Sequence, residues 1–283
     1  MKNPLTIPAR RTPGRWRTLG FLLAAVALAM ASFNPAQSVA GEQRGTRPTI
    51  VLVHGSWADA SSWNRVTERL RDDGYAVRAL PNPLRSVASD SASVRAFLET
   101  VPGPVVLVGH SYGGFVISNA ATGLPNVKAL VYVNSFAPEA GETPFQLVGP
   151  DSALAVDPAT VFDLVPADQP PTATTDVYLK RSAVFSSFAT GLDHDDKDLV
   201  FATQRPGAFG ALNDPSGTPA WKTIPSWSLI GTDDQIIPAA EQRKMSQRAG
   251  ATITEYEAGH LGLMTRPGTV TRVIGQAAHA VSR

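Results

Sequence analysis

The segment from residue 105 to residue 117 constrains the fold more than any other part of the chain. Val105-Val106-Leu107-Val108 is a continuous apolar run, as expected of a strand that is buried on both faces. Gly109-His110-Ser111-Tyr112-Gly113 follows, and Gly114-Phe115-Val116-Ile117 then begins a helical pattern. A buried strand that turns tightly into a helix is typical of a parallel sheet covered by helices.

The same alternation of short apolar runs and amphipathic stretches recurs along the chain. With 43% hydrophobic and 17% charged residues, the composition is that of an ordinary globular protein. Strands are predicted at residues 49–53, 75–80, 104–108, 127–133, 226–230 and 251–256, and helices at 62–73, 91–101 and from the glycine-rich turn through 121. The sequence therefore predicts an α/β fold with a mostly parallel central sheet flanked by helices.

The alternation stops between residues 138 and 223. Proline and aspartate become frequent there, and helix-like pieces such as 176–188 occur without strong β runs. About 85 residues without structure would be unusual inside a compact domain. We therefore expect a small, mostly helical cap inserted into the sheet domain. Phe185, Phe188, Phe201 and Phe209 either line an apolar pocket in this cap or form its core.

The first 40 residues have the features of a secretory signal peptide. A region that is basic and has no acidic residue precedes an apolar run from 19 to 31. This run, at about 13 residues, is shorter than the ~20 that a membrane-spanning helix needs. Ser38-Val39-Ala40 places small residues at the positions that a signal peptidase inspects. We expect cleavage after Ala40, a folded domain at 41–283 that is secreted or periplasmic, and no stable membrane insertion after processing.

The export route stays open between the general secretory and the twin-arginine pathway, because Arg10-Arg11 is followed by Pro13 and Gly14 rather than by an apolar stretch. Without its five basic N-terminal residues, the chain carries 20 basic and 24 acidic residues, a net charge of −4. Such a body, without basic clusters, argues against nucleic acid or anionic membrane as a partner and favours a small-molecule substrate. The sequence does not indicate an oligomeric state.

Metal and thiol chemistry have no support in the sequence. The chain contains no cysteine, which excludes disulfides, thiolate metal sites and a cysteine nucleophile. It also lacks a His-Glu-x-x-His motif, and the acidic stretch 193–196 is interpreted as a solvated turn. We therefore predict no metal and no other cofactor.

Ser111 is the candidate nucleophile. The turn between strand and helix holds such a residue in a strained conformation, and glycines on both sides avoid side-chain clashes. The position at a helix N-terminus also favours developing negative charge.

A serine hydroxyl needs a base to accept its proton, and five histidines compete for that role. His260 follows the last predicted strand and gives the order serine, acid, histidine that accompanies this kind of turn. For His54, His110, His194 and His279, ordinary packing or solvation is the interpretation that we favour. The loop after the strand at 226–230 supplies two neighbouring carboxylates, Asp233 and Asp234, to orient the base.

Negative charge on the carbonyl oxygen of a substrate requires N–H donors, an oxyanion hole. The Tyr112 N–H, directly after the serine, is one candidate. The second is expected in His54-Gly55-Ser56-Trp57, the loop after the first strand, where Ser56 is preferred and Trp57 is the neighbouring alternative.

Four motifs together resemble the α/β-hydrolase superfamily: the His-Gly loop, Gly-His-Ser-Tyr-Gly, Gly-Thr-Asp-Asp-Gln-Ile-Ile-Pro and Gly-His-Leu. The resemblance covers residues 49–281, and it is strongest to small bacterial esterases related to methyl-salicylate esterases and hydroxynitrile lyases. It implies a cofactor-free enzyme whose triad acid is Asp234. Glu139 and Glu142 stand at an alternative acid position that some relatives use.

Together with the predicted signal peptide, the resemblance thus implies a secreted serine hydrolase that cleaves carboxylic esters through a Ser-His-Asp triad and an acyl-enzyme intermediate. Hydroxynitrile lyases carry a lysine and a threonine where this chain has Leu261 and Gly55, so lyase activity is disfavoured. A cofactor-free haloperoxidase or perhydrolase would share the triad. A homologue that binds ligands without turnover is the alternative from another class.

Overall fold

The computed structural model describes residues 47–167 and 170–282. The predicted signal peptide and its cleavage site after Ala40 lie outside these residues. Within the described ranges, no helix combines the length and the apolar character that a membrane crossing requires.

A six-stranded sheet forms the centre of the domain, in the order β2-β1-β3-β4-β8-β9. Every neighbouring pair of its strands is parallel. The strands are β1 (Thr49–Val53), β2 (Val77–Leu80), β3 (Val105–Ser111), β4 (Val127–Ser135), β8 (Ser226–Gly231) and β9 (Thr252–Tyr256). The prediction of an α/β fold with a mostly parallel sheet is confirmed.

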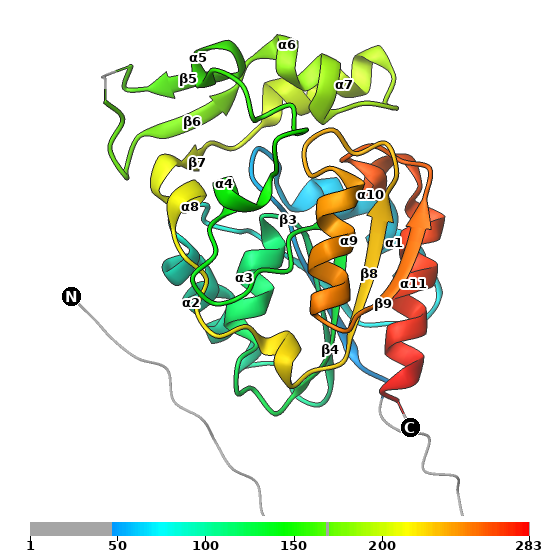
Figure 1. Cartoon of the computed structure of the whole chain (residues 1–283). Helices are drawn as coiled ribbons and strands as arrows, with labels where there is room; N and C mark the ends of the chain where they lie inside the picture. The colour runs from blue at the N-terminus through cyan, green and yellow to red at the C-terminus, as the bar shows by residue number, and fades with distance from the viewer. Residues whose placement is uncertain (1–46, 168–169, 283) are drawn as a thin grey trace, which may run out of the picture. The chain divides into compact units, whose positions relative to one another are not determined.

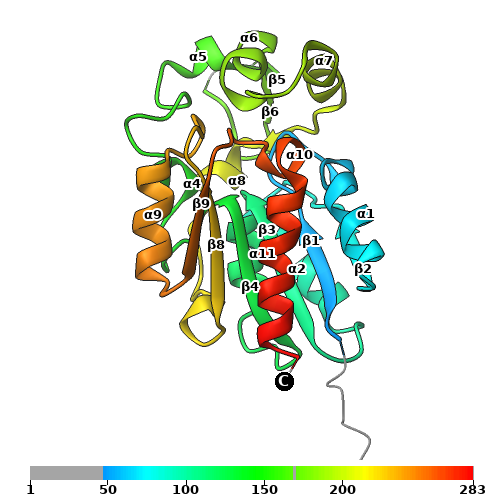
Figure 2. The ribbon, with the colours of Figure 1, turned by 90° about the vertical axis from the view of Figure 1, so that its right-hand side faces the viewer.

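Helices cover both faces of this sheet (Figures 1 and 2). On one face α1 (Asn64–Asp72) packs against α11 (Pro267–Ala280), and on the other α2 (Val87–Leu98) packs against α3 (Gly113–Ala120). α9 (Ala239–Arg248) packs on β8 and β9. Because strands between two helical layers meet no water, β3 is buried along its whole length, which explains its continuous apolar run.

Most of the chain between β4 and β8 forms a separate layer above the carboxyl ends of the central strands (Figure 1). It contains a three-stranded antiparallel sheet in the order β5-β6-β7 and several short helices. Its elements are α4 (Pro144–Leu147), α5 (Pro158–Val161), β5 (Phe162–Val165), β6 (Asp176–Leu179), α6 (Arg181–Ala183), the π-helix η2 (Val184–Phe188), α7 (His194–Thr203), β7 (Gly207–Ala208) and α8 (Phe209–Asn213). The 3-10 helix η3 (Ala220–Lys222) lies outside this layer, because it directly precedes the amino end of β8 and packs on α3.

The inserted layer contains strands that the sequence analysis did not predict. Residues 176–188, expected as one helix-like piece, begin with β6 and become helical only from Arg181. In β6 the side chains of Val177 and Leu179 are buried, whereas Asp176 and Tyr178 are partly exposed. This period of two is that of a strand with one buried face, but four residues are too few to distinguish it from a helix by pattern alone.

Two short elements complete the region around the carboxyl ends of the strands. The 3-10 helix η1 (Ala60–Trp63) follows the loop after β1, and α10 (Gly262–Thr265) follows the loop after β9. These loops therefore meet the turn after β3 at the edge of the sheet where ligands bind in α/β proteins.

Candidate active site

Ser111 stands in the sharp turn between β3 and α3. Its φ angle is +53°, a left-handed conformation that is unusual for a residue with a side chain. The turn is tightly packed: a Cβ atom on Gly109 would lie 2.7 Å from the Gly113 carbonyl oxygen, and one on Gly113 would lie 2.6 Å from the Val53 carbonyl oxygen. The two glycines are therefore required by close backbone approach, as the sequence pattern indicated.

The side chains of Ser111, His260 and Asp234 form a continuous hydrogen-bonded chain. His260 Nε2 lies 3.0 Å from Ser111 Oγ, and His260 Nδ1 lies 3.0 Å from Asp234 Oδ2. All three residues are buried. An ionised carboxylate only accepts hydrogen bonds, so Nδ1 donates to Asp234 and Nε2 remains free to accept the Ser111 proton.

The alternative acids have other partners. Asp233 is exposed, and its carboxylate contacts the Thr232 hydroxyl. Glu139 pairs with Lys222 at 2.7 Å, and Glu142 pairs with Arg248 at 2.6 Å. The structure thus places Asp234, and none of these other carboxylates, against the His260 ring.

Asp234 is held by four further donors. The backbone N–H groups of Ile236 and Ile237 donate to Oδ1 over 2.9 and 3.0 Å. The amides of Asn134 and Gln242 donate to Oδ2 over 3.1 and 2.9 Å. Hydrogen bonds to the charged form stabilise a carboxylate, and they fix both of its oxygens relative to His260.

Asn134 and Gln242 were missed by the sequence analysis. Asn134 is fully buried with a φ angle of +45°, accepts a hydrogen bond from the Tyr256 hydroxyl and donates to the Gly259 carbonyl oxygen beside His260. A signal was available, because Asn134 is a polar residue at the carboxyl end of an apolar strand, where the site of a parallel sheet lies. Gln242 lies within α9 and gave no such signal.

The predicted oxyanion loop lies directly against Ser111. A Cβ atom on Gly55 would lie 2.6 Å from the Ser111 Cβ, so only glycine allows this approach. Ser56, Trp57 and Tyr112 border one small cavity together with Ser111. Among the described residues, no acceptor takes a hydrogen bond from the backbone N–H of Ser56, Trp57 or Tyr112.

Two buried histidines fix these loops. Asn82 donates its backbone N–H to His54 Nε2 over 2.9 Å, and His54 Nδ1 lies 2.9 Å from the Gly55 carbonyl oxygen. Burial lowers the pKa of His54 to about 4, so this ring is neutral at pH 7. His110 Nε2 lies 2.9 Å from the His260 carbonyl oxygen, and burial likewise lowers the pKa of His110 well below its ordinary value.

The ring of Tyr112 anchors the other oxyanion candidate. Its hydroxyl donates to the fully buried Asp90 over 2.9 Å. Burial raises the pKa of Tyr112 well above its ordinary value, and the charge of Asp90 adds to this increase. The same carboxylate accepts the backbone N–H of Arg85, whose guanidinium pairs with Asp176 of the inserted layer at 2.7 Å.

The four aromatic residues considered for the cap have different roles. Phe209 borders a large cavity beneath the antiparallel sheet. Phe188 packs its ring 6.1 Å from Trp57 and 5.3 Å from His260, between centroids. Phe185 lies under the Arg181 guanidinium at 3.9 Å, and Phe201 is partly buried against the core. Phe209 thus lines a cavity, whereas Phe185, Phe188 and Phe201 pack against other side chains.

In the part of the chain that the structure describes, no three His, Asp or Glu side chains form a cluster suited to a metal ion. The geometry instead combines a buried serine, a histidine and a carboxylate in a row, next to backbone N–H groups without acceptors. This arrangement can transfer an acyl group.

The model of the alpha/beta hydrolase family matches residues 50–273. The chain belongs to this family. It is 26% identical over 260 residues to the alpha/beta hydrolase nvfD of Aspergillus novofumigatus, covering 82% of this chain and 97% of that protein. It is 27% identical over 244 residues to Methylesterase 8 of Arabidopsis thaliana, covering 77% and 85%.

The fold of this hydrolase is also that of a solved esterase. The crystal structure of polyneuridine aldehyde esterase superposes with a TM-score of 0.69 at 20% identity, covering 81% of this chain and 98% of that one. The resemblance to an esterase branch of the family is confirmed by these relatives, which support a hydrolytic enzyme.

Proposed function

We propose that this alpha/beta hydrolase is a serine esterase that cleaves carboxylic esters through an acyl-enzyme intermediate. The observation that carries the proposal is the row of hydrogen bonds from Ser111 Oγ through His260 to Asp234. The methylesterase relative supports the substrate class.

In the first half of the reaction, Ser111 Oγ attacks the ester carbonyl carbon while His260 Nε2 accepts its proton. The new bond converts the carbonyl oxygen into an oxyanion, which the backbone N–H groups of Ser56 and Tyr112 stabilise. The bond to the alcohol oxygen then breaks, and His260 returns the proton to the leaving alcohol. Asp234 stays ionised and stabilises the imidazolium ring.

In the second half, a water molecule repeats the attack on the acyl-enzyme. His260 takes a proton from this water, and the bond between Ser111 Oγ and the acyl carbon breaks. Ser111 recovers its proton from His260, and the carboxylic acid leaves. No cofactor enters either half.

Two sequence differences weigh against lyase chemistry. Leu261 follows His260 and is buried, so this position provides no cation beside the histidine. Gly55 follows His54, and its lack of a side chain is required by the packing against Ser111. A perhydrolase would use the same triad, and the methylesterase relative favours hydrolysis.

Turnover of p-nitrophenyl acetate by the purified protein tests the proposal. We expect hydrolysis by the unsubstituted protein and a loss of kcat by several orders of magnitude in Ser111→Ala, with an unchanged unfolding temperature. The binding-only alternative predicts no turnover by either protein. Full activity of Ser111→Ala would refute the proposal.

We further propose that the enzyme acts outside the cytoplasm, on the basis of the basic and apolar character of residues 1–40. Sequencing the N-terminus of the protein recovered from the periplasm or the medium tests this. A mature N-terminus at Gly41 is expected. Retention of the protein in the cytoplasm with Met1 in place would contradict the export proposal without affecting the proposed chemistry.

A further inference from the structure

Two cavities of very different size adjoin each other at the active site. The smaller, of about 20 Å³, is bordered by Ser111, Ser56 and Tyr112. The larger, of about 720 Å³, lies beneath the antiparallel sheet of the inserted layer. Phe145 and Leu212 border both cavities, so these two side chains stand between the serine and the large chamber.

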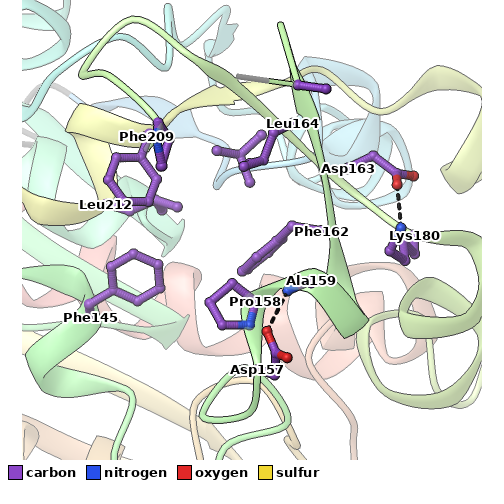
Figure 3. A pocket seen from close by; sticks show the side chains of 13 residues that line it. Phe145, Asp157, Pro158, Ala159, Phe162, Asp163, Leu164, Lys180, Phe209 and Leu212 are labelled. Carbon is purple, nitrogen blue, oxygen red and sulfur yellow. Dashed lines mark hydrogen bonds and ion pairs between the residues drawn. The ribbon is translucent and has the colours of Figure 1, made fainter. Parts of the chain in front are cut away.

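The large chamber is lined mainly by apolar groups. Figure 3 shows Phe145, Phe162, Leu164, Phe209 and Leu212 around its open space. The labelled polar side chains are paired: Asp163 with Lys180, and Asp157 with the backbone N–H of Ala159 over 3.0 Å. The chamber therefore favours an apolar group, and its volume lies in the range of small-molecule sites, roughly 300–1,000 Å³.

The residues around the small cavity determine which part of an ester enters it. The cavity is bordered by the nucleophile and by both expected oxyanion residues, whereas His260 does not border it. The leaving alcohol oxygen must face His260 Nε2 to receive its proton. The acyl chain consequently extends to the other side, into the small cavity and past Phe145 and Leu212.

We propose that the large chamber is the binding site for the far end of the acyl group. The substrates are carboxylic esters whose acyl part is unbranched next to the carbonyl and carries a bulky apolar group farther along. A cavity of about 20 Å³ has room for little more than one water-sized group, so a branch next to the carbonyl is disfavoured there. This inference rests on the proposed esterase function.

Three p-nitrophenyl esters with the same alcohol test the inference: the acetate, the ω-phenylpentanoate and the pivalate, which is branched next to the carbonyl. We expect the kcat/KM of the phenylpentanoate to exceed that of the acetate by at least about tenfold, because even one methylene in an apolar pocket brings roughly that factor. The pivalate is expected to be the poorest substrate of the three.

A variant with a bulky side chain at the chamber wall tests whether the chamber holds the acyl group. Ala159 borders the chamber but is exposed, so Ala159→Trp adds volume there without disturbing the core. We expect the preference for phenylpentanoate over acetate to fall about tenfold. Val156→Trp is the control, since Val156 lies on the same segment, is 50% exposed and does not border the chamber.

The outcomes separate the inference from the function on which it rests. Equal efficiency toward acetate and phenylpentanoate, or a preference that Ala159→Trp leaves unchanged, overturns the acyl chamber while the esterase function stands. Hydrolysis of none of the three esters contradicts the esterase function and the inference together. A preference that falls in Ala159→Trp but persists in Val156→Trp supports the chamber.

Discussion

The surroundings of Ser111 and the chamber beneath the inserted layer differ in how they are held. Asp234 accepts hydrogen bonds from four groups besides His260, all of them buried. At the chamber, by contrast, the polar contacts are exposed pairs such as that of Lys180 and Asp163, whose side chains are 33% and 58% exposed. Exposed pairs contribute little to stability, whereas buried networks fix geometry. We infer that the first region sets the chemistry and the second sets the choice of substrate.

The largest effect is expected from the carboxylate in the first region. Asp234→Asn preserves the shape of the side chain but removes the charge that orients and stabilises the His260 ring. We predict a loss of kcat of about 10⁴-fold, the size found when a triad aspartate becomes asparagine. Asp233→Asn is the matched control, because Asp233 is the exposed neighbour, and near-normal kcat is expected. The opposite ranking in steady-state kinetics would assign the acid to Asp233.

A smaller effect is expected from the positioning residue behind that carboxylate. Asn134→Ala removes one donor to Asp234 and the partner of the Tyr256 hydroxyl. Hydrogen bonds to charged groups contribute about 1.5–3 kcal/mol, so kcat should fall roughly tenfold to a hundredfold. A positioning role predicts this fall in kcat with little change in KM.

Asn126→Ala serves as the control for Asn134. Asn126 lies directly before β4, at the opposite end of this strand from Asn134, and its side chain donates to the Leu98 carbonyl oxygen. Unchanged kcat in Asn134→Ala, together with a lower unfolding temperature, would reduce Asn134 to a structural role.

The first region should also make the fold sensitive to acid. The folded protein resists protonation of His54 down to about pH 4, whereas the unfolded chain takes up this proton near the ordinary pKa of 6.5. The unfolded state therefore binds more protons between these values, and stability decreases as the pH falls through them. The contribution of His54 to this loss is on the order of 3 kcal/mol by pH 4.

Chemical denaturation at several pH values tests the role of His54. His54→Asn should show a flatter pH dependence of the unfolding free energy than the unsubstituted protein. His194→Asn, which changes a side chain that is 71% exposed, should keep the original slope. Equal slopes in all three proteins would remove His54 as the cause.

The smallest effect is expected in the second region. Phe209→Ala removes an aromatic ring from the chamber wall, so the KM for the phenylpentanoate ester should rise about tenfold. Its kcat should change less, because no contact to the triad is lost. Phe185→Ala is the control, since Phe185 packs under Arg181 and does not border the chamber. A fall in kcat comparable to that of Asn134→Ala would break the distinction between the two regions.

The two regions also differ in how far the sequence predicts them. The turn at Ser111 is local: strand, glycines and helix lie within 13 residues, so its conformation follows from the pattern. The contact between Asn134 and Asp234 joins residues 100 positions apart, and no local pattern specifies it. The catalytic roles of Ser111, His260 and Asp234 stay predictions, although the structure brings their side chains together.

The inserted layer was predicted less well for a different reason. Phe162–Val165 and Asp176–Leu179 are four residues each, and their pairing partner is another short strand rather than the central sheet. Such strands are stabilised by tertiary contacts, for example the hydrogen bond from the Trp57 indole to the Val177 carbonyl oxygen across 120 positions. The β propensity of a short segment depends on its own residues and therefore does not indicate these contacts.

Covalent labelling tests the central claim most directly. A fluorophosphonate probe reacts with an activated serine, so intact-mass and peptide analysis of the labelled protein should locate one adduct on the peptide that contains Ser111. Ser111→Ala should give no adduct, and Asp234→Asn should label far more slowly. An adduct on another residue, or unchanged labelling of Ser111→Ala, would contradict the account.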